Sequence, residues 1–215
     1  MKCYEYYLFD ADGTLLDSAE LIYQSFAYAC RIVADFPLTR AQVHAHVGLS
    51  VRALIERYLG PLANEEYAAV YQAQLEFQLR MYRQYLTLFP GVLLTLQALK
   101  SQGKHLAIVS ARRQDTLLPY LRETRIYDYF DVIVSPELTN GTNKPDPAPA
   151  FKALEAMNGL PEHSLFVGDV PTDVECGYRA GMDTAFVAWS HCAPENFSPQ
   201  PTLILKEMQD LVRCN

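Results

Sequence analysis

The sequence predicts an α/β protein built on a doubly wound parallel sheet, with an α-helical domain inserted near its N-terminus. From Phe89 onwards, short apolar segments alternate with longer amphipathic ones, and repeated βα units give a parallel sheet with helices on both faces. Residues 18–85 carry helical patterns only. We therefore expect a core made of residues 1–16 and 87–215, and a helical insertion at 17–86 that follows the first strand.

Short apolar segments mark the expected strands of the core. The first, from Tyr4 to Phe9, is rich in aromatic and apolar residues, as a buried strand should be. The second follows Gly103, a residue type that is common just past the end of a helix. The strands after the first are expected at 105–109, 132–134, 165–167 and 184–187. Helices are expected between them, at about 114–123, from Pro147, and from Pro171 to Gly181.

The inserted segment has the pattern of a helical domain throughout. Ser18 is a suitable N-cap for a helix whose apolar residues recur at helical spacing. Thr39, followed three residues later by Gln42, matches a capping box. A longer helix is expected from Asn64 to about Tyr85.

Composition limits the classes of partner. The chain of 215 residues has a formal net charge of −7 and a pI near 5.2, and a negative body repels the phosphates of nucleic acids. No segment approaches the ~20 consecutive apolar residues of a membrane-spanning helix. The five cysteines are scattered without a C-x-x-C pair, which is typical of reduced thiols. We expect a cytoplasmic monomer or homodimer that binds a small molecule, and neither nucleic acid nor membrane.

Two acidic residues directly follow the first strand. Asp10 and Asp12 are separated by one residue, and side chains at i and i+2 of extended chain point the same way. They therefore project together at the carboxyl end of the strand, where open α/β sheets bind ligands. Gly13 permits a sharp turn after them. Because two close carboxylates repel each other unless a cation or a shared proton is present, this arrangement predicts a metal site beside a carboxylate nucleophile.

Polar residues at three later positions suit the same chemistry. Phosphoryl transfer needs a nucleophile, hydrogen-bond donors, a cation and further acids, because its charge lies on the phosphoryl oxygens and the protein mostly positions and neutralises. The residues are Ser110 and Ala111 after the second strand, Lys144 just before a helix, and Gly168-Asp169 with Asp173 after the strand at 165–167. Together with the acid pair, they predict a phosphoryl-transfer site at the carboxyl edge of the sheet.

Taken in order, these motifs resemble those of the haloacid dehalogenase superfamily, in its phosphatase branch with a helical C1-type cap after the first strand. Residues 10–14 (Asp-Ala-Asp-Gly-Thr) match the first motif, Ser110 the second, Lys144 the third, and 168–169 with Asp173 the fourth. The resemblance spans essentially the whole chain and is nearest to the phosphoglycolate-phosphatase-like subgroup. It implies a Rossmann-like core and Mg²⁺-dependent hydrolysis of a small phosphomonoester.

The resemblance also implies a role for each motif residue. Asp10 attacks phosphorus and forms an aspartyl-phosphate. Asp12 protonates the leaving oxygen and then deprotonates the attacking water, while Thr14 orients Asp12. Ser110 and the N–H of Ala111 bind phosphate oxygens.

The implied cofactor is Mg²⁺. Its expected ligands are a side-chain oxygen of Asp10, the main-chain carbonyl of Asp12 and a carboxylate oxygen of Asp169, with water completing the octahedron. Asp173 is expected to support this set of ligands. Lys144 is expected to neutralise charge between the phosphate and the nucleophile.

Two other functions stay open beside the phosphatase. A β-phosphoglucomutase-like phosphoryl transfer is less favoured, because the cap histidine of those relatives falls at Ile22 here. A non-catalytic phosphate-binding regulatory protein of the same fold would not need Asp12 as an acid or base. Asp12 also separates the chain from dehalogenases and phosphonate-cleaving members, which lack the second acid, and so favours phosphate esters.

The candidate specificity residues are Ser50, Arg52 and Arg112. Ser50 and Arg52 belong to a predicted loop between two helices of the insertion, and Arg52 could bind a carboxylate or a second phosphate. In the second motif Ala111 replaces a frequent asparagine, so that Arg112 or the next residue, Arg113, could supply the anion contact. Phosphoglycolate, a sugar phosphate, a nucleotide and pyrophosphate are all candidate substrates.

Overall fold

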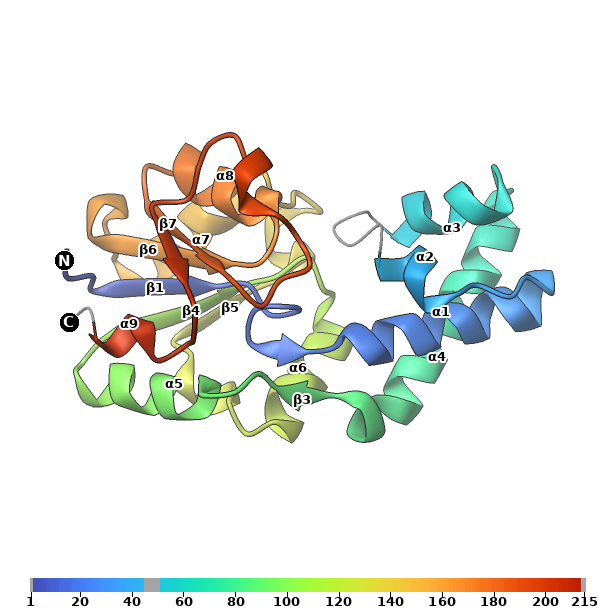
Figure 1. Ribbon diagram of the computed structural model, residues 1–215, viewed down its shortest axis with the longest axis horizontal. Helices are drawn as coiled ribbons and strands as arrows, with labels where there is room; N and C mark the ends of the chain where they lie inside the picture. The colour runs from blue at the N-terminus through green and yellow to red at the C-terminus, as the bar shows by residue number, and fades with distance from the viewer. Residues whose placement is uncertain (1, 45–50, 214–215) are drawn as a thin grey trace. The chain divides into compact units, whose positions relative to one another are not determined.

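The computed structural model describes residues 2–44 and 51–213, which divide into two compact units (Figure 1). The core unit consists of Met1–Asp17 and Thr87–Asn215, and the inserted unit consists of Ser18–Leu86. Each unit has a hydrophobic cluster of its own. The insertion thus begins directly after Asp17 and ends at Leu86, just before the core resumes at Thr87.

The core unit is organised around one sheet of six strands in the order β5-β4-β1-β6-β7-β8. All neighbouring strands run parallel, which confirms the predicted fold class. The strands are β1 (Tyr6–Phe9), β4 (His105–Val109), β5 (Val132–Val134), β6 (Ser164–Gly168), β7 (Asp183–Val187) and β8 (Leu203–Leu205). The edge strand β8 was not predicted, because it has three residues, of which Ile204 is exposed, and follows a proline-rich segment.

The strand order places β1 at the switch point of the sheet. The chain adds β4 and β5 on one side of β1, and β6, β7 and β8 on the other. Phe9 of β1 lies beside Ile108 of β4 and Val167 of β6. The residues that follow these three strands therefore meet at one carboxyl edge, where the diverging connections of an α/β sheet leave a crevice for ligands.

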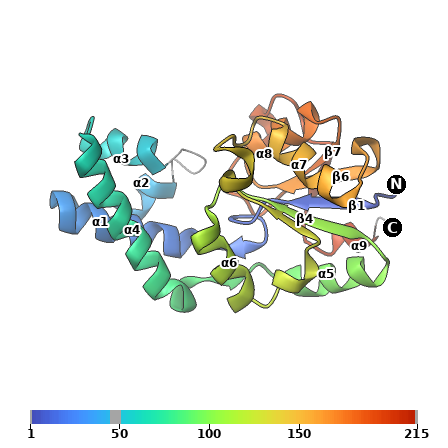
Figure 2. The ribbon, with the colours of Figure 1, turned by 180° about the vertical axis from the view of Figure 1, so that it is seen from behind.

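Helices cover both faces of this sheet: α7 and α8 lie on one face, and α5 and α9 on the other (Figures 1 and 2). The strands between them are apolar on both sides, as strands of a parallel sheet must be; Leu8, Ala107 and Phe166 are almost completely buried. The helices are α5 (Val92–Ser101), α6 (Gln114–Glu123), α7 (Ala148–Met157), α8 (Pro171–Arg179) and α9 (Asp210–Arg213), with 3₁₀ turns at Tyr127–Tyr129, Pro136–Thr139, Pro161–His163 and Pro194–Asn196.

Two very short strands mark the points where the chain leaves and re-enters the core unit. β2 (Leu16–Asp17) and β3 (Thr87–Leu88) pair antiparallel. Strands of two residues are too short to show an alternating pattern, and for this reason the sequence did not predict them.

In the described residues of the inserted unit, all regular secondary structure is helical. Its helices are α1 (Ala19–Ala34), α2 (Arg40–His44), α3 (Val51–Leu59) and α4 (Asn64–Tyr85). The predicted capping box is present, since Gln42 Oε1 accepts the N–H of Thr39 at 2.8 Å and the N–H of Gln42 donates to Thr39 Oγ1 at 3.4 Å. Within residues 2–44 and 51–213, no helix has the length and apolarity needed to cross a membrane.

Candidate active site

The turn after β1 presents the first two acids. The N–H of Asp10 still donates to the carbonyl of Val167 on β6 at 2.9 Å, so its backbone is fixed by the sheet. The chain then turns at Gly13, which has a φ of +84° and whose N–H donates to the carbonyl of Leu16 at 2.9 Å. Asp10 is buried and Asp12 half-buried, so that Asp10 faces a drier environment than Asp12.

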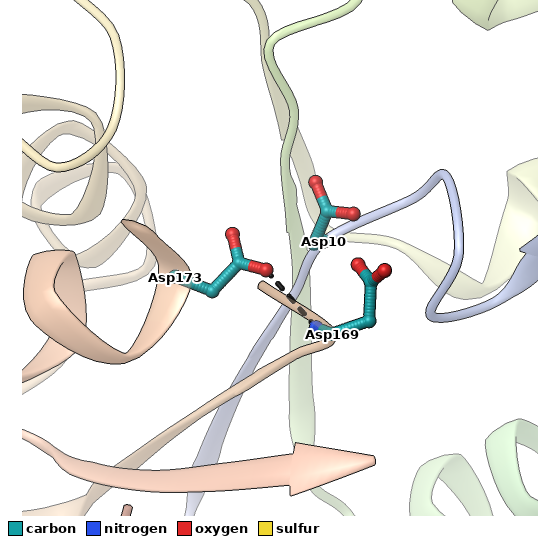
Figure 3. Close-up of side chains that lie close together, drawn as sticks. All are labelled: Asp10, Asp169 and Asp173. Carbon is teal, nitrogen blue, oxygen red and sulfur yellow. Dashed lines mark hydrogen bonds between the residues drawn. The ribbon is translucent and has the colours of Figure 1, made fainter. Parts of the chain in front are cut away.

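Three carboxylates meet at the carboxyl ends of β1 and β6 (Figure 3). Asp10 follows β1, Asp169 follows β6 and Asp173 lies in the first turn of α8; one oxygen from each lies within 4.8 Å of the others, and all three are buried. Asp173 Oδ2 also accepts the N–H groups of Asp169 at 3.0 Å and Val170 at 3.1 Å. These two bonds fix the backbone that carries Asp169, so Asp173 supports the cluster as well as belonging to it.

Lys144 is the cation of the carboxylate cluster. Its Nζ lies 2.5 Å from Asp10 Oδ1 and 2.6 Å from Asp173 Oδ1, and the side chain is 6% exposed. The ammonium therefore links the acid after β1 to the acid of α8. Because a buried charge is stable only when it is paired, Lys144 and the two acids depend on one another.

The cluster nevertheless holds more negative than positive charge. Burial raises the pKa of Asp10 to about 7, since the nearby Lys144 compensates only part of the desolvation and Asp173 adds repulsion. Burial, followed by repulsion from Asp10 and Asp173, also raises the pKa of Asp169 well above its usual value. Three buried carboxylates face one ammonium, and an all-oxygen set of this kind fits a hard divalent cation such as Mg²⁺.

Thr14 and Ser190 provide further hydrogen bonds around Asp169. Thr14, expected to orient Asp12, donates its hydroxyl to Asp169 Oδ1 at 3.3 Å, because the turn at Gly13 brings it back towards β6. Ser190 Oγ donates to the main-chain carbonyl of Asp169 at 2.5 Å. No sequence motif pointed to Ser190, which lies in a loop after β7.

The second motif lies at the end of β4. Ser110 is buried, and its N–H donates to the carbonyl of Val134 on β5 at 3.0 Å. Its hydroxyl accepts the N–H of Arg112 at 3.1 Å, which closes a tight turn, and Ala111 at the top of this turn is exposed. The hydroxyl of Ser110 and the backbone at Ala111 thus lie at the same edge of the sheet as Asp10.

Arg112 forms an ion pair that sequence reasoning missed. Its Nε donates to Asp12 Oδ2 at 2.7 Å and its Nη2 to Asp12 Oδ1 at 3.0 Å. The signal was available, because Arg112 and Asp12 follow neighbouring parallel strands at nearly equal distances from the paired residues Phe9 and Ile108. Arg112 was expected near the substrate, and the structure brings it to the second acid of the first motif.

Of the two specificity residues expected from the insertion, the structure describes Arg52, which belongs to a helix and not to the predicted loop. Arg52 lies on α3, where its Nε bonds Glu56 Oε1 at 2.8 Å and its guanidinium lies 4.7 Å from the ring centre of Tyr67. Ser50 lies outside the described residues. A contact of either residue with a substrate stays a prediction.

Comparison with known proteins points to the same family as the sequence motifs. The family model described as haloacid dehalogenase-like hydrolase matches residues 7–187. A phosphoglycolate phosphatase of Aquifex aeolicus is 35% identical over 206 residues, which cover 96% of this chain and 94% of that protein. A pyrophosphatase, PpaX, of Listeria monocytogenes is 31% identical over 207 residues, covering 95% and 93%. A solved structure of a haloacid dehalogenase-like hydrolase of Bacteroides fragilis has 26% identity and a TM-score of 0.85, covering 97% of this chain and 99% of that one.

Mg²⁺ should stabilise the folded protein through the carboxylate cluster. Mg²⁺ at a hundred times its Kd should raise the Tm by about 5–10 °C, since it relieves the repulsion among Asp10, Asp169 and Asp173 and binds only the folded state. Asp169→Asn should keep the fold but lose the Mg²⁺-induced shift in Tm. Asp128→Asn, which changes an exposed acid, should keep that shift. Differential scanning calorimetry with Mg²⁺ and with EDTA measures the three proteins. An equal shift in Asp169→Asn would contradict this metal site.

Gly13→Ala should disrupt the same metal site by displacing Asp169. A Cβ at Gly13 would lie 2.2 Å from Asp169 Oδ2, on a backbone with a φ of +84°. Gly181→Ala is the matched control, because its φ is +78° but its Cβ would meet only Pro161 Cβ at 3.7 Å. Both variants should lose stability through backbone strain, and only Gly13→Ala should also lose the Mg²⁺-induced shift in Tm. The same loss in both variants would contradict the close approach of Gly13 and Asp169.

Proposed function

Since the chain belongs to the family of haloacid dehalogenase-like hydrolases, we propose that it hydrolyses a small phosphomonoester with Mg²⁺, through an aspartyl-phosphate on Asp10. The observation that carries the proposal is the buried carboxylate of Asp10, held by Lys144 and grouped with Asp169 and Asp173. Membership of this family identifies the chain as an enzyme of the phosphatase type. The roles of its individual residues are proposed.

Asp10 is suited to be the nucleophile. The sheet fixes its backbone, and Lys144 holds one of its oxygens at 2.5 Å, so the carboxylate needs little reorganisation before it attacks phosphorus. The attack forms a bond between an Asp10 oxygen and phosphorus as the bond to the leaving oxygen breaks. Lys144 stays beside the reacting oxygens and neutralises the charge of the incoming phosphate.

Asp12 is suited to transfer the proton in both halves of the reaction. It lies two residues beyond the nucleophile and is less buried, so it can reach a leaving oxygen and later a water molecule. In the first half it gives a proton to the leaving oxygen, and in the second it takes one from the water that attacks the aspartyl-phosphate. Asp12 is therefore protonated again at the end of each turnover.

The residues that would hold Mg²⁺ are the carboxylates of Asp10 and Asp169 and the main-chain carbonyl of Asp12. When bound, the ion supplies positive charge to the phosphate oxygens and so reduces their repulsion from the Asp10 carboxylate. Asp173 keeps Asp169 in place through the two N–H bonds that it accepts. The Ser110 hydroxyl and the Ala111 N–H would bind phosphate oxygens on the β4 side.

The substrate is proposed to be a small phosphorylated metabolite in the cytoplasm. Phosphoglycolate and pyrophosphate are the first compounds to test, because proteins named for these activities are 35% and 31% identical to the chain. Cys3, Cys30, Cys176 and Cys192 are free thiols in the described part of the chain, which supports a reducing compartment.

Phosphate release from a panel of phosphorylated metabolites tests the proposed function. The wild type should release phosphate with Mg²⁺ and not with EDTA, and Asp10→Asn should reduce turnover at least about 10³-fold, because an amide cannot replace the nucleophile. Asp128→Asn, an exposed acid of the same unit, is the matched control and should keep wild-type turnover.

Wild-type turnover in Asp10→Asn would contradict the proposed nucleophile. Transfer of phosphate between positions of a sugar without accumulation of free phosphate would instead identify a mutase. Tight binding of a phosphorylated compound without any turnover in Mg²⁺ would identify a binding protein.

A further inference from the structure

We infer that Arg112 is a positioning residue for Asp12, holding that carboxylate in the orientation in which it transfers the proton. The inference rests on the proposed function, because it gives Arg112 a role only if Asp12 is the acid and base. It replaces the expectation that Arg112 contacts the substrate as an anion-binding residue.

The ion pair fixes both oxygens of Asp12. Nε and Nη2 of Arg112 each donate to a different oxygen, at 2.7 and 3.0 Å, which is the bidentate arrangement that a planar guanidinium makes with a carboxylate. A single hydrogen bond would leave the carboxylate free to rotate about its last torsion angle. Two parallel bonds to one rigid group remove that freedom.

Arg112 is itself held by α6 and by its own turn. Its guanidinium lies 4.7 Å from the ring centre of Tyr120, which is fully buried, and its Nη1 lies 3.4 Å from Thr116 Oγ1. Its N–H donates to Ser110 Oγ at 3.1 Å. The side chain is 11% exposed. Contacts with a buried face of α6 thus fix Arg112, and Arg112 in turn fixes Asp12, which lies on a turn.

The distribution of partners disfavours a substrate contact. Nε and Nη2 are used by Asp12 and Nη1 by Thr116, so every nitrogen of the guanidinium has a partner within the chain. The neighbouring Arg113 differs in each respect: its side chain is 56% exposed, and its Nε lies 3.3 Å from Asp115 and 3.6 Å from Glu137 at the surface. Arg113 therefore offers a matched control one residue away.

The test uses p-nitrophenyl phosphate with Mg²⁺ as the probe and compares Arg112→Met, Arg112→Lys and Arg113→Met. Arg112→Met should lower kcat by about 10–100-fold, part of the 10²–10⁴ that general acid–base catalysis contributes, and KM should fall with kcat, because slower hydrolysis of the aspartyl-phosphate lowers both. Arg112→Lys keeps the charge but cannot make the bidentate contact, so its kcat should lie between those of Arg112→Met and the wild type. Arg113→Met should match the wild type.

A double-mutant cycle shows whether Arg112 acts through Asp12. When Asp12→Asn has already removed the acid and base, adding Arg112→Met should lower kcat no further, because the residue that Arg112 positions is gone. Stopped flow adds a second readout. The leaving nitrophenolate needs little protonation, whereas hydrolysis of the aspartyl-phosphate needs the base, so Arg112→Met should release a rapid burst of about one nitrophenolate per enzyme before a slow steady state.

Three results would overturn the inference. A raised KM with unchanged kcat would assign Arg112 to substrate binding. Multiplicative losses in the cycle would show that Arg112 acts independently of Asp12. A loss of kcat that follows the loss of folded protein in thermal melts of both Arg112 variants would show a structural role only. Absence of any Mg²⁺-dependent turnover in the wild type would instead reject the proposed function, and this outcome is distinct from the other three.

Discussion

The rest of the site depends on compensation of the negative charge that β1 and β6 bring together. In the part of the chain that the structure describes, Asp10, Asp169 and Asp173 are buried at one edge of the sheet and are paired with the ammonium of Lys144. Removing one partner of such a buried pair costs roughly 3–5 kcal/mol, against a total stability of about 5–15 kcal/mol for a typical domain. The loss of either partner would therefore remove much of the stability, and the negative charge that Lys144 leaves uncompensated is what a divalent cation can balance.

At this edge of the sheet, Asp10 and Asp12, the two acids of the first motif, lie in different environments. Asp10 is buried and bound to a lysine that also binds Asp173, so it is held as a rigid group. Asp12, two residues later, is less buried and is bound by an arginine from the neighbouring strand end. The proposed reaction needs a rigid nucleophile and a nearby group that transfers a proton. Residues 10–12 would supply both, because β1 ends between β4 and β6.

The sequence was sufficient for the features that depend on local pattern. Apolar segments located the strands at 105–109 and 132–134 to the residue, and polar residues just after strands located Asp10, Ser110 and Asp169. Pattern was insufficient where a contact depends on neighbouring strands or on a loop without a motif. The ion pair of Arg112 with Asp12 needs the pairing of β1 with β4, and the Ser190 bond to Asp169 needs the path of a loop.

Chemical trapping of the phosphorylated residue would identify the nucleophile of the proposed reaction. Asp12→Asn, in which hydrolysis of the intermediate should be slow, is mixed with p-nitrophenyl phosphate and Mg²⁺, quenched with borohydride and digested for mass spectrometry. Borohydride reduces an aspartyl-phosphate to homoserine, so we expect homoserine at position 10 and no change at Asp169 or Asp173. Phosphate found on Ser110, or an unmodified Asp10 in protein that still releases nitrophenolate, would contradict it.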